Sequence, residues 1–290
     1  MGTREIVIDR PIVIGIVNVT PDSFSDGGNF FDTDMAVAHA QTLVDDGADA
    51  LDFGGESTRP GADAVDDPEE SRRVIPVIER VRALLPNVPI SIDTWKTSVA
   101  KSAIEAGADI VNDVSALRFD PKLGVLVAKK KAGLILMHSR GKLAEISSYK
   151  HSKYSGDVCD DVAEELNERA SRALALGIAK ESIVLDPGIG FSKTGDQSRA
   201  ILRKLDKLKK LGYPILVGTS RKRTISEAIR EARGLAEDAE IPTDSRDAGT
   251  AGANVIALCS GATLFRVHNV ALNRAALDVA WRILRNTQRT

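Results

Sequence analysis

The side chains best suited to chemistry stand where short apolar runs of the chain end. Asp93, Asn112 and Asp186 each end or follow such a run, and their carboxylate and amide oxygens accept hydrogen bonds. An aminopyrimidine ring presents donors along one edge, so acceptors of this kind predict recognition of a donor-rich heterocycle. Lys222, after another run, is placed to contact either this ring or an anion beside it.

A second group of residues suits a multiply charged anion. Asn18 lies in the first apolar run, and Arg266 and His268 lie in the last. First and last strands become neighbours when a barrel closes, and these side chains can then hold a diphosphate together with a divalent metal. Any one of these residues alone is more simply explained as a buried polar group that holds a loop. Polar residues at all eight ends favour a functional site.

The runs that must position these residues are rich in β-branched side chains and alternate with longer amphipathic stretches, which is typical of repeated βα units. The predicted strands cover residues 12–19, 48–54, 89–93, 108–114, 133–138, 182–188, 214–220 and 262–268. Predicted helices include residues 34–47, 68–85, 95–107, 160–177 and 199–212. Eight units favour a closed (β/α)8 TIM barrel of the α/β class, with residues 1–290 in a single domain. An open doubly wound sheet shows the same alternation of strands and helices and stays an alternative.

The loops after the first two predicted strands are long and rich in Gly, Pro, Ser and Asp. Their simplest interpretation is solvent-exposed turns. Asp22, Phe24 and Arg59 on these loops are also placed over the mouth of a barrel, where they predict a lid that orders on substrate binding. The segment 232–247 is interpreted as a loop insertion, to which no function is assigned.

The composition bounds the class of protein. Of 290 residues 43% are hydrophobic, and 39 basic against 41 acidic residues leave a formal charge of −2. This balance argues against nucleic acid or an anionic membrane as a partner, and no run approaches the ~20 apolar residues of a membrane helix. Cys159 and Cys259 lack metal-binding spacing and favour reduced thiols in a cytoplasmic protein. The expected partners are therefore small molecules.

The motifs at these strand ends resemble those of dihydropteroate synthase, a family of pterin-binding enzymes of folate biosynthesis. A lone glycine-rich loop would be weak ground for this assignment, whereas eight ordered motifs over nearly the whole chain are specific. The motifs are GIVNVTPDSFSDGG (15–28), GGESTRPGA (54–62), SIDTWK (91–96), IVNDVS (110–115), LMH (136–138), DPGIGFSKT (186–194), GTSRK (218–222) and RVH (266–268).

The resemblance implies a transferase. Its 6-hydroxymethyl-7,8-dihydropterin diphosphate substrate loses diphosphate first, and the amine of 4-aminobenzoate then captures the methylene carbon, giving 7,8-dihydropteroate, with Mg²⁺ assisting. The implied enzyme is a homodimer and a sulfonamide target.

Site residues are implied position by position. The pterin group comprises Asp93, Asn112, Val114, Met137, Asp186 and Lys222. The diphosphate group comprises Asn18, Thr58, Arg266 and His268, with Asn18 also the metal ligand. The aminobenzoate group comprises Thr58, Arg59, Pro60, Phe191 and Ser220. The catalytic residues implied are Asp93, Asp186, Lys222 and Arg59.

Three features depart from the family pattern, and one is the loop MHSRGKLAEI (137–146), which lacks the Thr-Pro common after its Gly. Arg223 stands where members usually carry Ser, whose hydroxyl receives the aminobenzoate carboxylate, and Asn269 stands where Asp is usual. We hypothesise that the Arg223 guanidinium meets this carboxylate, or excludes larger analogues of the substrate. The alternative is a solvated arginine in the first turn of a helix, where a cation opposes the helix dipole.

Two other functions remain open at this point. One is a catalytically silent pterin-binding paralogue, and the other is a pterin-dependent methyltransferase domain. The first has no need of Asn18, Arg266 and His268, and the second fits the motifs GGESTRPGA and GTSRK poorly.

Overall fold

All eight strands of the computed structural model, which describes residues 4–19, 29–57 and 65–286, belong to one parallel sheet. The order is β6-β5-β4-β3-β2-β1-β8-β7. A parallel bridge between Leu185 and Ile215 joins the two outer strands, and the Leu185 amide donates to the Pro214 carbonyl at 3.0 Å. The sheet therefore closes, and the TIM barrel predicted from the sequence is confirmed. The strands are β1 Ile12–Asn18, β2 Ala50–Gly54, β3 Ile90–Asp93, β4 Ile110–Asp113, β5 Gly133–Met137, β6 Ile183–Asp186, β7 Leu216–Val217 and β8 Leu264–Val267.

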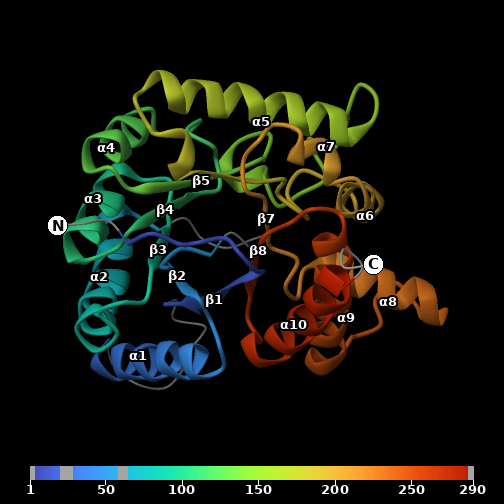
Figure 1. Ribbon diagram of the computed structural model, residues 1–290, viewed down its shortest axis with the longest axis horizontal. Coiled ribbons are helices and arrows are strands. Elements are labelled where there is room, and N and C mark those ends of the chain that lie inside the picture. The colour runs from blue at the N-terminus through green and yellow to red at the C-terminus, as the bar shows by residue number, and fades with distance from the viewer. Residues whose placement is uncertain (1–3, 20–28, 58–64, 287–290) are drawn as a thin grey trace.

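Helices surround the barrel: in the view of Figure 1, α1 to α4 lie at the left and lower left, α5 crosses the top and α6 to α10 lie at the right. They are α1 Asn29–Asp45, α2 Asp67–Leu84, α3 Thr97–Ala106, α4 Lys122–Lys130, α5 Val158–Ala175, α6 Gly195–Arg203, α7 Asp206–Lys209, α8 Arg223–Arg233, α9 Thr243–Cys259 and α10 Val270–Asn286. Short 3-10 turns lie at Leu143–Glu145 and Lys180–Ser182. Each strand therefore leads into helical structure, as repeated βα units require.

Local sequence explains several helix ends. The Asp66 carboxylate accepts from the Glu69 amide at 2.8 Å and caps α2, and Thr194 and Gln197 form a reciprocal capping box at the start of α6. Gly107 ends α3 and Gly234 ends α8 in left-handed conformation, which glycine adopts without a side-chain clash. The loops that follow α3 and α8 are fixed in direction by these residues.

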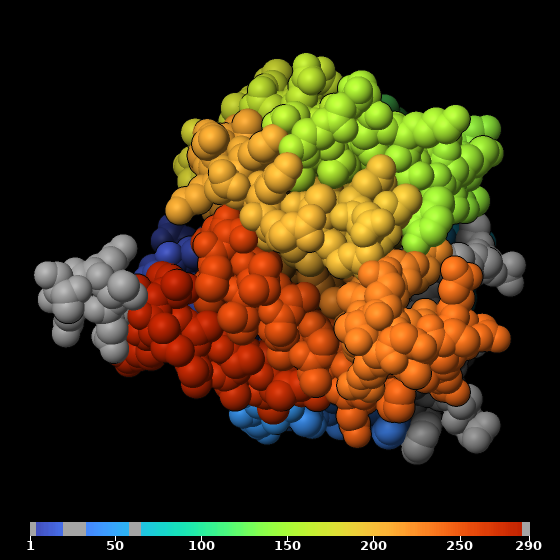
Figure 2. Space-filling view, turned by 90° about the vertical axis from the view of Figure 1, so that its right-hand side faces the viewer, coloured from blue at the N-terminus to red at the C-terminus, as the bar shows by residue number. Residues whose placement is uncertain are grey.

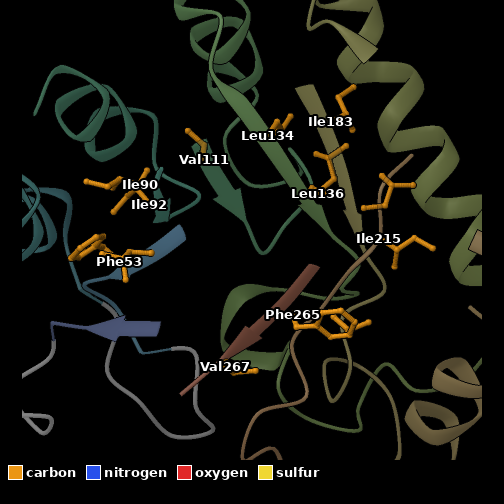
Figure 3. Packing of buried hydrophobic residues seen from close by; sticks show 14 of the residues in the cluster. Phe53, Ile90, Ile92, Val111, Leu134, Leu136, Ile183, Ile215, Phe265 and Val267 are labelled. Atoms are coloured by element: carbon orange, nitrogen blue, oxygen red, sulfur yellow. The ribbon is translucent and has the colours of Figure 1, made fainter. Parts of the chain in front are cut away.

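Buried apolar side chains fill two layers, inside the barrel and between the barrel and its helices. Along β1, Ile12 and Ile14 pack in the inner cluster and Val13 and Val17 in the outer one. Figure 3 shows part of the outer cluster, including Phe53, Ile92, Val111, Leu136 and Phe265. Because successive side chains of a strand point to opposite faces, this alternation defines which residues of every strand face the barrel interior.

The segment interpreted as a loop insertion, 232–247, contains the end of α8 and the beginning of α9. Residues 234–242 join the two helices. Whether this segment is an insertion stays a prediction. In the described part of the chain, the helices are too short or too polar to span a membrane.

Candidate active site

Three of the polar residues singled out from the sequence, Arg266, Asn112 and Asp186, share the inward face of the barrel. Arg266 lies two residues after Leu264 of the inner cluster, and Asn112 lies two after Ile110, which packs against that cluster. Asp186 follows Val184 in the same way. The inward-facing polar residues lie at or near the carboxyl ends of their strands, where TIM barrels place their active sites.

A buried polar network joins β2, β3, β4 and β8. Asp93 and Asn112 are register partners. Arg266 donates from Nη2 to Asp93 Oδ2 at 2.9 Å and from Nε to Asp52 Oδ2, and Asn112 Nδ2 donates to the same Asp52 oxygen at 3.2 Å. Asp52 is 1% exposed. Arg266, predicted at the diphosphate, therefore contacts the carboxylates on the pterin side of the barrel.

Asp186 and Lys222 lie at the opposite side of the barrel mouth. Asp186 Oδ1 accepts from the Gly188 amide at 2.7 Å, which orients the carboxylate. Lys222 is the residue before α8, and its Nζ donates to the Ile189 carbonyl at 2.7 Å. The same Nζ lies 4.2 Å from the centroid of the Phe191 ring, a favourable cation–π distance. The β6–α6 loop thus contacts both predicted pterin residues.

A separate apolar cluster lies beside these polar groups. Val114, Met137, Ile146 and Phe191 pack together, with Trp95 among the partly buried side chains against them. Val114 and Met137, predicted to line a ring slot, are brought together with Phe191, which was predicted at the aminobenzoate. An apolar wall beside a row of acceptors suits a flat heterocycle with donors on its edge.

Burial controls the charges at this site. Burial raises the pKa of Asp93 to about 7. The Arg266 cation acts in the opposite direction, whereas repulsion from the carboxylates of Asp52 and Glu70 raises the pKa further. Burial lowers the pKa of Lys222 to about 8 against the attraction of the Asp186 carboxylate. It also raises the pKa of Asp186, while Lys222 opposes that shift. Buried ionisable groups whose pKa values are shifted in opposite directions at one end of a barrel are typical of active sites.

His268 and Ser220 meet at the ends of β8 and β7. Ser220 Oγ and His268 Nδ1 are 2.9 Å apart, and the His268 amide donates to the same hydroxyl at 3.1 Å. Asn18 ends β1 and is the register partner of Gly54. The fold thus places Asn18 and His268 on or beside neighbouring strands, as the predicted anion site requires. Their roles there stay predictions.

The three cations at 221–223 have separate partners. Arg221 donates to both oxygens of Asp247 at 2.7 and 2.8 Å, and Asn269 donates to Asp247 as well. Arg223 begins α8, and its guanidinium carbon lies 3.9 Å from the centroid of the Tyr149 ring. Arg221 is therefore a structural cation, whereas Arg223 stands at the surface with its side chain 43% exposed.

Five predicted residues lie outside the described ranges: Asp22, Phe24, Thr58, Arg59 and Pro60. The lid and part of the aminobenzoate group therefore stay predictions.

Sequence reasoning missed the carboxylate of Asp52 and the carbonyl of Ile189 as parts of the site. A signal for Asp52 was present, because a charged residue in the middle of the apolar run ALDFG needs a buried partner. No side-chain pattern marks Ile189, since its contribution is a backbone oxygen.

Comparison with known proteins agrees with this geometry. The family model for pterin binding enzymes matches residues 14–268. A dihydropteroate synthase of Clostridium beijerinckii is 40% identical over 98% of this chain and 99% of its own length. Xanthomonas albilineans dihydropteroate synthase with 4-aminobenzoic acid is 43% identical, with a TM-score of 0.84 over 98% of this chain and 95% of that one. Its complex with 7,8-dihydropteroate is 41% identical, with a TM-score of 0.82 over 98% and 96%.

The barrel and its ring of acceptors thus define a pterin-binding enzyme. Within that class the chain belongs to the dihydropteroate synthase family.

Proposed function

We propose that this chain condenses 6-hydroxymethyl-7,8-dihydropterin diphosphate with 4-aminobenzoate to give 7,8-dihydropteroate and diphosphate, and that it is a transferase. The observation that carries the proposal is the row of acceptors at Asp93, Asn112 and Asp186 beside the apolar wall of Met137 and Phe191. Because the silent paralogue and the methyltransferase need no aminobenzoate chemistry, the relatives that bind 4-aminobenzoic acid and dihydropteroate favour the synthase over both.

The chemistry needs stabilised charge more than a nucleophile. When the carbon–oxygen bond to diphosphate breaks, its electron pair leaves with the diphosphate and positive charge develops on the pterin. The carboxylates of Asp93 and Asp186 stabilise this cation. The aminobenzoate nitrogen then forms the new bond to the methylene carbon and releases a proton. Water kept away from the cation prevents hydrolysis.

One assay tests the function. The protein is incubated with the pterin diphosphate and Mg²⁺, and diphosphate release is measured with and without 4-aminobenzoate. Release and formation of dihydropteroate are expected with both substrates. No release in either case contradicts the synthase, and release without dihydropteroate indicates a defective second-substrate site.

We also propose Mg²⁺ as the metal, with the amide oxygen of Asn18 as a ligand. The described residues contain no group of three His, Cys, Asp or Glu side chains that could hold a metal. Mg²⁺ suits such a sparse site, because it keeps several waters and takes other oxygens from substrate phosphates. When bound, it would neutralise charge on the departing diphosphate. Chelation with EDTA should abolish turnover, and excess Mg²⁺ should restore it.

The pKa shifts predict a bell-shaped pH profile. Asp93 has to be ionised to accept from the pterin, so kcat/KM for the pterin diphosphate should rise as pH increases through about 7. Lys222 loses its proton as pH increases through about 8, so activity should then fall. Measurement of kcat/KM between about pH 5 and 9.5 checks both limbs. An Asp93→Asn variant should lack the acid limb, and a flat wild-type profile across pH 7 would contradict the role of Asp93.

If the Arg223 guanidinium binds the aminobenzoate carboxylate, its replacement should weaken binding of the second substrate, 4-aminobenzoate, and of no other. Arg223→Ser should raise the KM for 4-aminobenzoate about tenfold, because a hydrogen bond to a charged group contributes about 1.5 kcal/mol or more. The KM for the pterin diphosphate should not change. Arg172→Ser, at an exposed arginine in the last turn of α5, is the control. Unchanged 4-aminobenzoate and sulfonamide affinities would leave Arg223 as a cation held by Tyr149 and Glu227 alone.

A homodimer is proposed through the face that carries α6, α8 and α9 (Figure 2). These helices line a cavity of about 370 Å³ whose walls include Leu202, Ile225 and Ile229. Ile256 of α9 also lines the cavity and is 50% exposed. An apolar hollow with an exposed isoleucine at its edge suits contact with a second copy of the chain. Light scattering should give twice the chain mass, and Ile256→Asp should reduce it to one chain.

A cytoplasmic location is also proposed. It is supported by two free cysteines, of which Cys259 is exposed, since exposed thiols are maintained in reducing compartments. Cell fractionation tests it.

A further inference from the structure

A fully buried lysine follows the site loop. Lys193 is 0% exposed, and its Nζ donates to three acceptors: His138 Nδ1 at 2.8 Å, the Phe191 carbonyl at 2.9 Å and the Gly188 carbonyl at 3.2 Å. An ammonium carries three N–H groups, so these contacts use its entire donor capacity. A lysine is rarely buried to this extent without a specific partner, and two of its three partners are backbone oxygens of one short loop.

The loop held by Lys193 carries much of the candidate site. The Gly188 amide orients the Asp186 carboxylate, the Ile189 carbonyl accepts from Lys222, and the Phe191 ring lies beside the Lys222 ammonium. Lys193 therefore fixes the backbone at both ends of the segment on which Lys222 rests.

The backbone at Gly188 leaves this loop little freedom to settle elsewhere. Gly188 has φ +68, and a Cβ at this position would lie 1.9 Å from the His138 carbonyl. The loop thus packs directly on the end of β5, and the ammonium of Lys193 joins the same two segments by hydrogen bonds.

The lysine is in turn oriented from helix α5. Burial lowers the pKa of His138 to about 3, so the imidazole is neutral. Its Nδ1 accepts from Lys193, which leaves Nε2 to donate to Glu165 Oε2 at 3.1 Å. The other oxygen of Glu165 accepts from Arg140 Nε at 2.9 Å. A continuous chain of hydrogen bonds therefore joins α5 to the site loop through His138 and Lys193.

The surrounding charges act on Lys193 in both directions. Burial lowers its pKa to about 7, with Lys222 and Arg140 contributing to the shift, while the carboxylates of Asp186 and Glu165 oppose it. Carbonyl oxygens can only accept, so the geometry itself requires N–H donors at this nitrogen.

We propose that Lys193 is a positioning residue for the condensation. Its three hydrogen bonds hold residues 188–191 in the shape that seats Lys222 at the pterin with the Phe191 ring beside it, and His138 with Glu165 orients Lys193 from the side of α5. This proposal rests on the proposed function of the site, because it assumes that Lys222 contacts the pterin substrate.

The test compares Lys193→Met with the wild type. Methionine keeps the length of the side chain and removes the donors. The KM for the pterin diphosphate should rise and kcat/KM should fall about 10- to 100-fold, since a displacement near 1 Å at a site can cost 100-fold. The KM for 4-aminobenzoate should rise by a smaller factor, because Phe191 belongs to the predicted aminobenzoate group and its carbonyl also loses the Lys193 hydrogen bond. A purely structural lysine gives a different result, because loss of folded enzyme lowers the apparent kcat and leaves both KM values unchanged.

A second pair of variants covers the case in which Lys193→Met does not fold. Glu165→Gln breaks the outer end of the chain of hydrogen bonds, and Glu164→Gln changes the neighbouring exposed carboxylate on the same helix. The first should raise the KM for the pterin diphosphate about threefold or more, and the second should leave it unchanged.

The outcomes separate the two proposals. A wild type that makes no dihydropteroate contradicts the proposed function. If the wild type is active, two results overturn the positioning role. One is a KM for the pterin diphosphate that is the same in Lys193→Met as in the wild type, and the other is a KM that is equal in the two glutamate variants.

Discussion

Replacement of Lys222 by methionine is expected to lower kcat/KM for the pterin diphosphate by about two to three orders of magnitude. Removal of one preorganised donor at a charged transition state typically costs about 2–4 kcal/mol. Lys222 has this position, because its Nζ lies over the Phe191 ring and interacts with the Asp186 carboxylate. Steady-state kinetics with both substrates measure the loss.

The same variant should be at least as stable as the wild type. Burial lowers the pKa of Lys222 to about 8, so the folded state holds the charged side chain at a cost in stability. Methionine removes that cost, and the unfolding midpoint should stay the same or rise. Lys129→Met, at an exposed lysine of α4, should change neither property. A Lys222→Met enzyme with near wild-type kcat/KM would remove this residue from the site.

Stability at alkaline pH offers an independent check on this cost. The pKa of such a lysine is lower in the folded than in the unfolded state. At pH values between these two pKa values, the unfolded chain therefore binds more protons than the folded protein. The free energy of unfolding contributed by Lys222 should therefore rise with pH from about 8 toward the ordinary lysine value. Lys222→Met should lack this rise.

The barrel could be predicted because every strand is buried on both faces. Runs such as IVIGIVNV are apolar at successive positions, which distinguishes them from half-exposed strands and from amphipathic helices. Helix boundaries were less predictable. The stretch 199–212 was predicted as one helix, yet α6 ends at Arg203 and α7 begins at Asp206. The buried residues Ile201, Leu205 and Leu208 keep a helical spacing across this break, so periodicity does not reveal it.

The residues of the site could be predicted better than the contacts between their side chains. Strand ends follow from the chain, and they placed Asp93, Asn112 and Asp186 correctly at or near the carboxyl ends of their strands. Which cation contacts which carboxylate depends on side chains that cross the barrel. Arg266 and Asp52 are 214 positions apart in the sequence, and no local pattern joins them. Lys193 was missed for a related reason, since a buried lysine looks like a surface lysine in a sequence.

The Arg266 network carries the second large effect. Replacement of Arg266 by methionine should lower the free energy of unfolding by about 3–5 kcal/mol, because it leaves the carboxylates of Asp52 and Asp93 buried without their cation. Asp52 Oδ1 already lacks a hydrogen-bond partner among the described residues, so little else can compensate. Chemical denaturation at neutral pH measures the loss.

The pH dependence and a double variant identify the cause of that loss. Without Arg266 the pKa of Asp93 should rise further above its usual value, so the folded state binds more protons than the unfolded one. The destabilisation should therefore be larger at about pH 8 than at about pH 5.5. Asp52→Asn in the Arg266→Met background should restore part of the stability, because it removes one of the two unpaired charges. Equal losses at both pH values, or a double variant whose losses simply add, would mean that Arg266 stabilises the barrel by packing and not by charge.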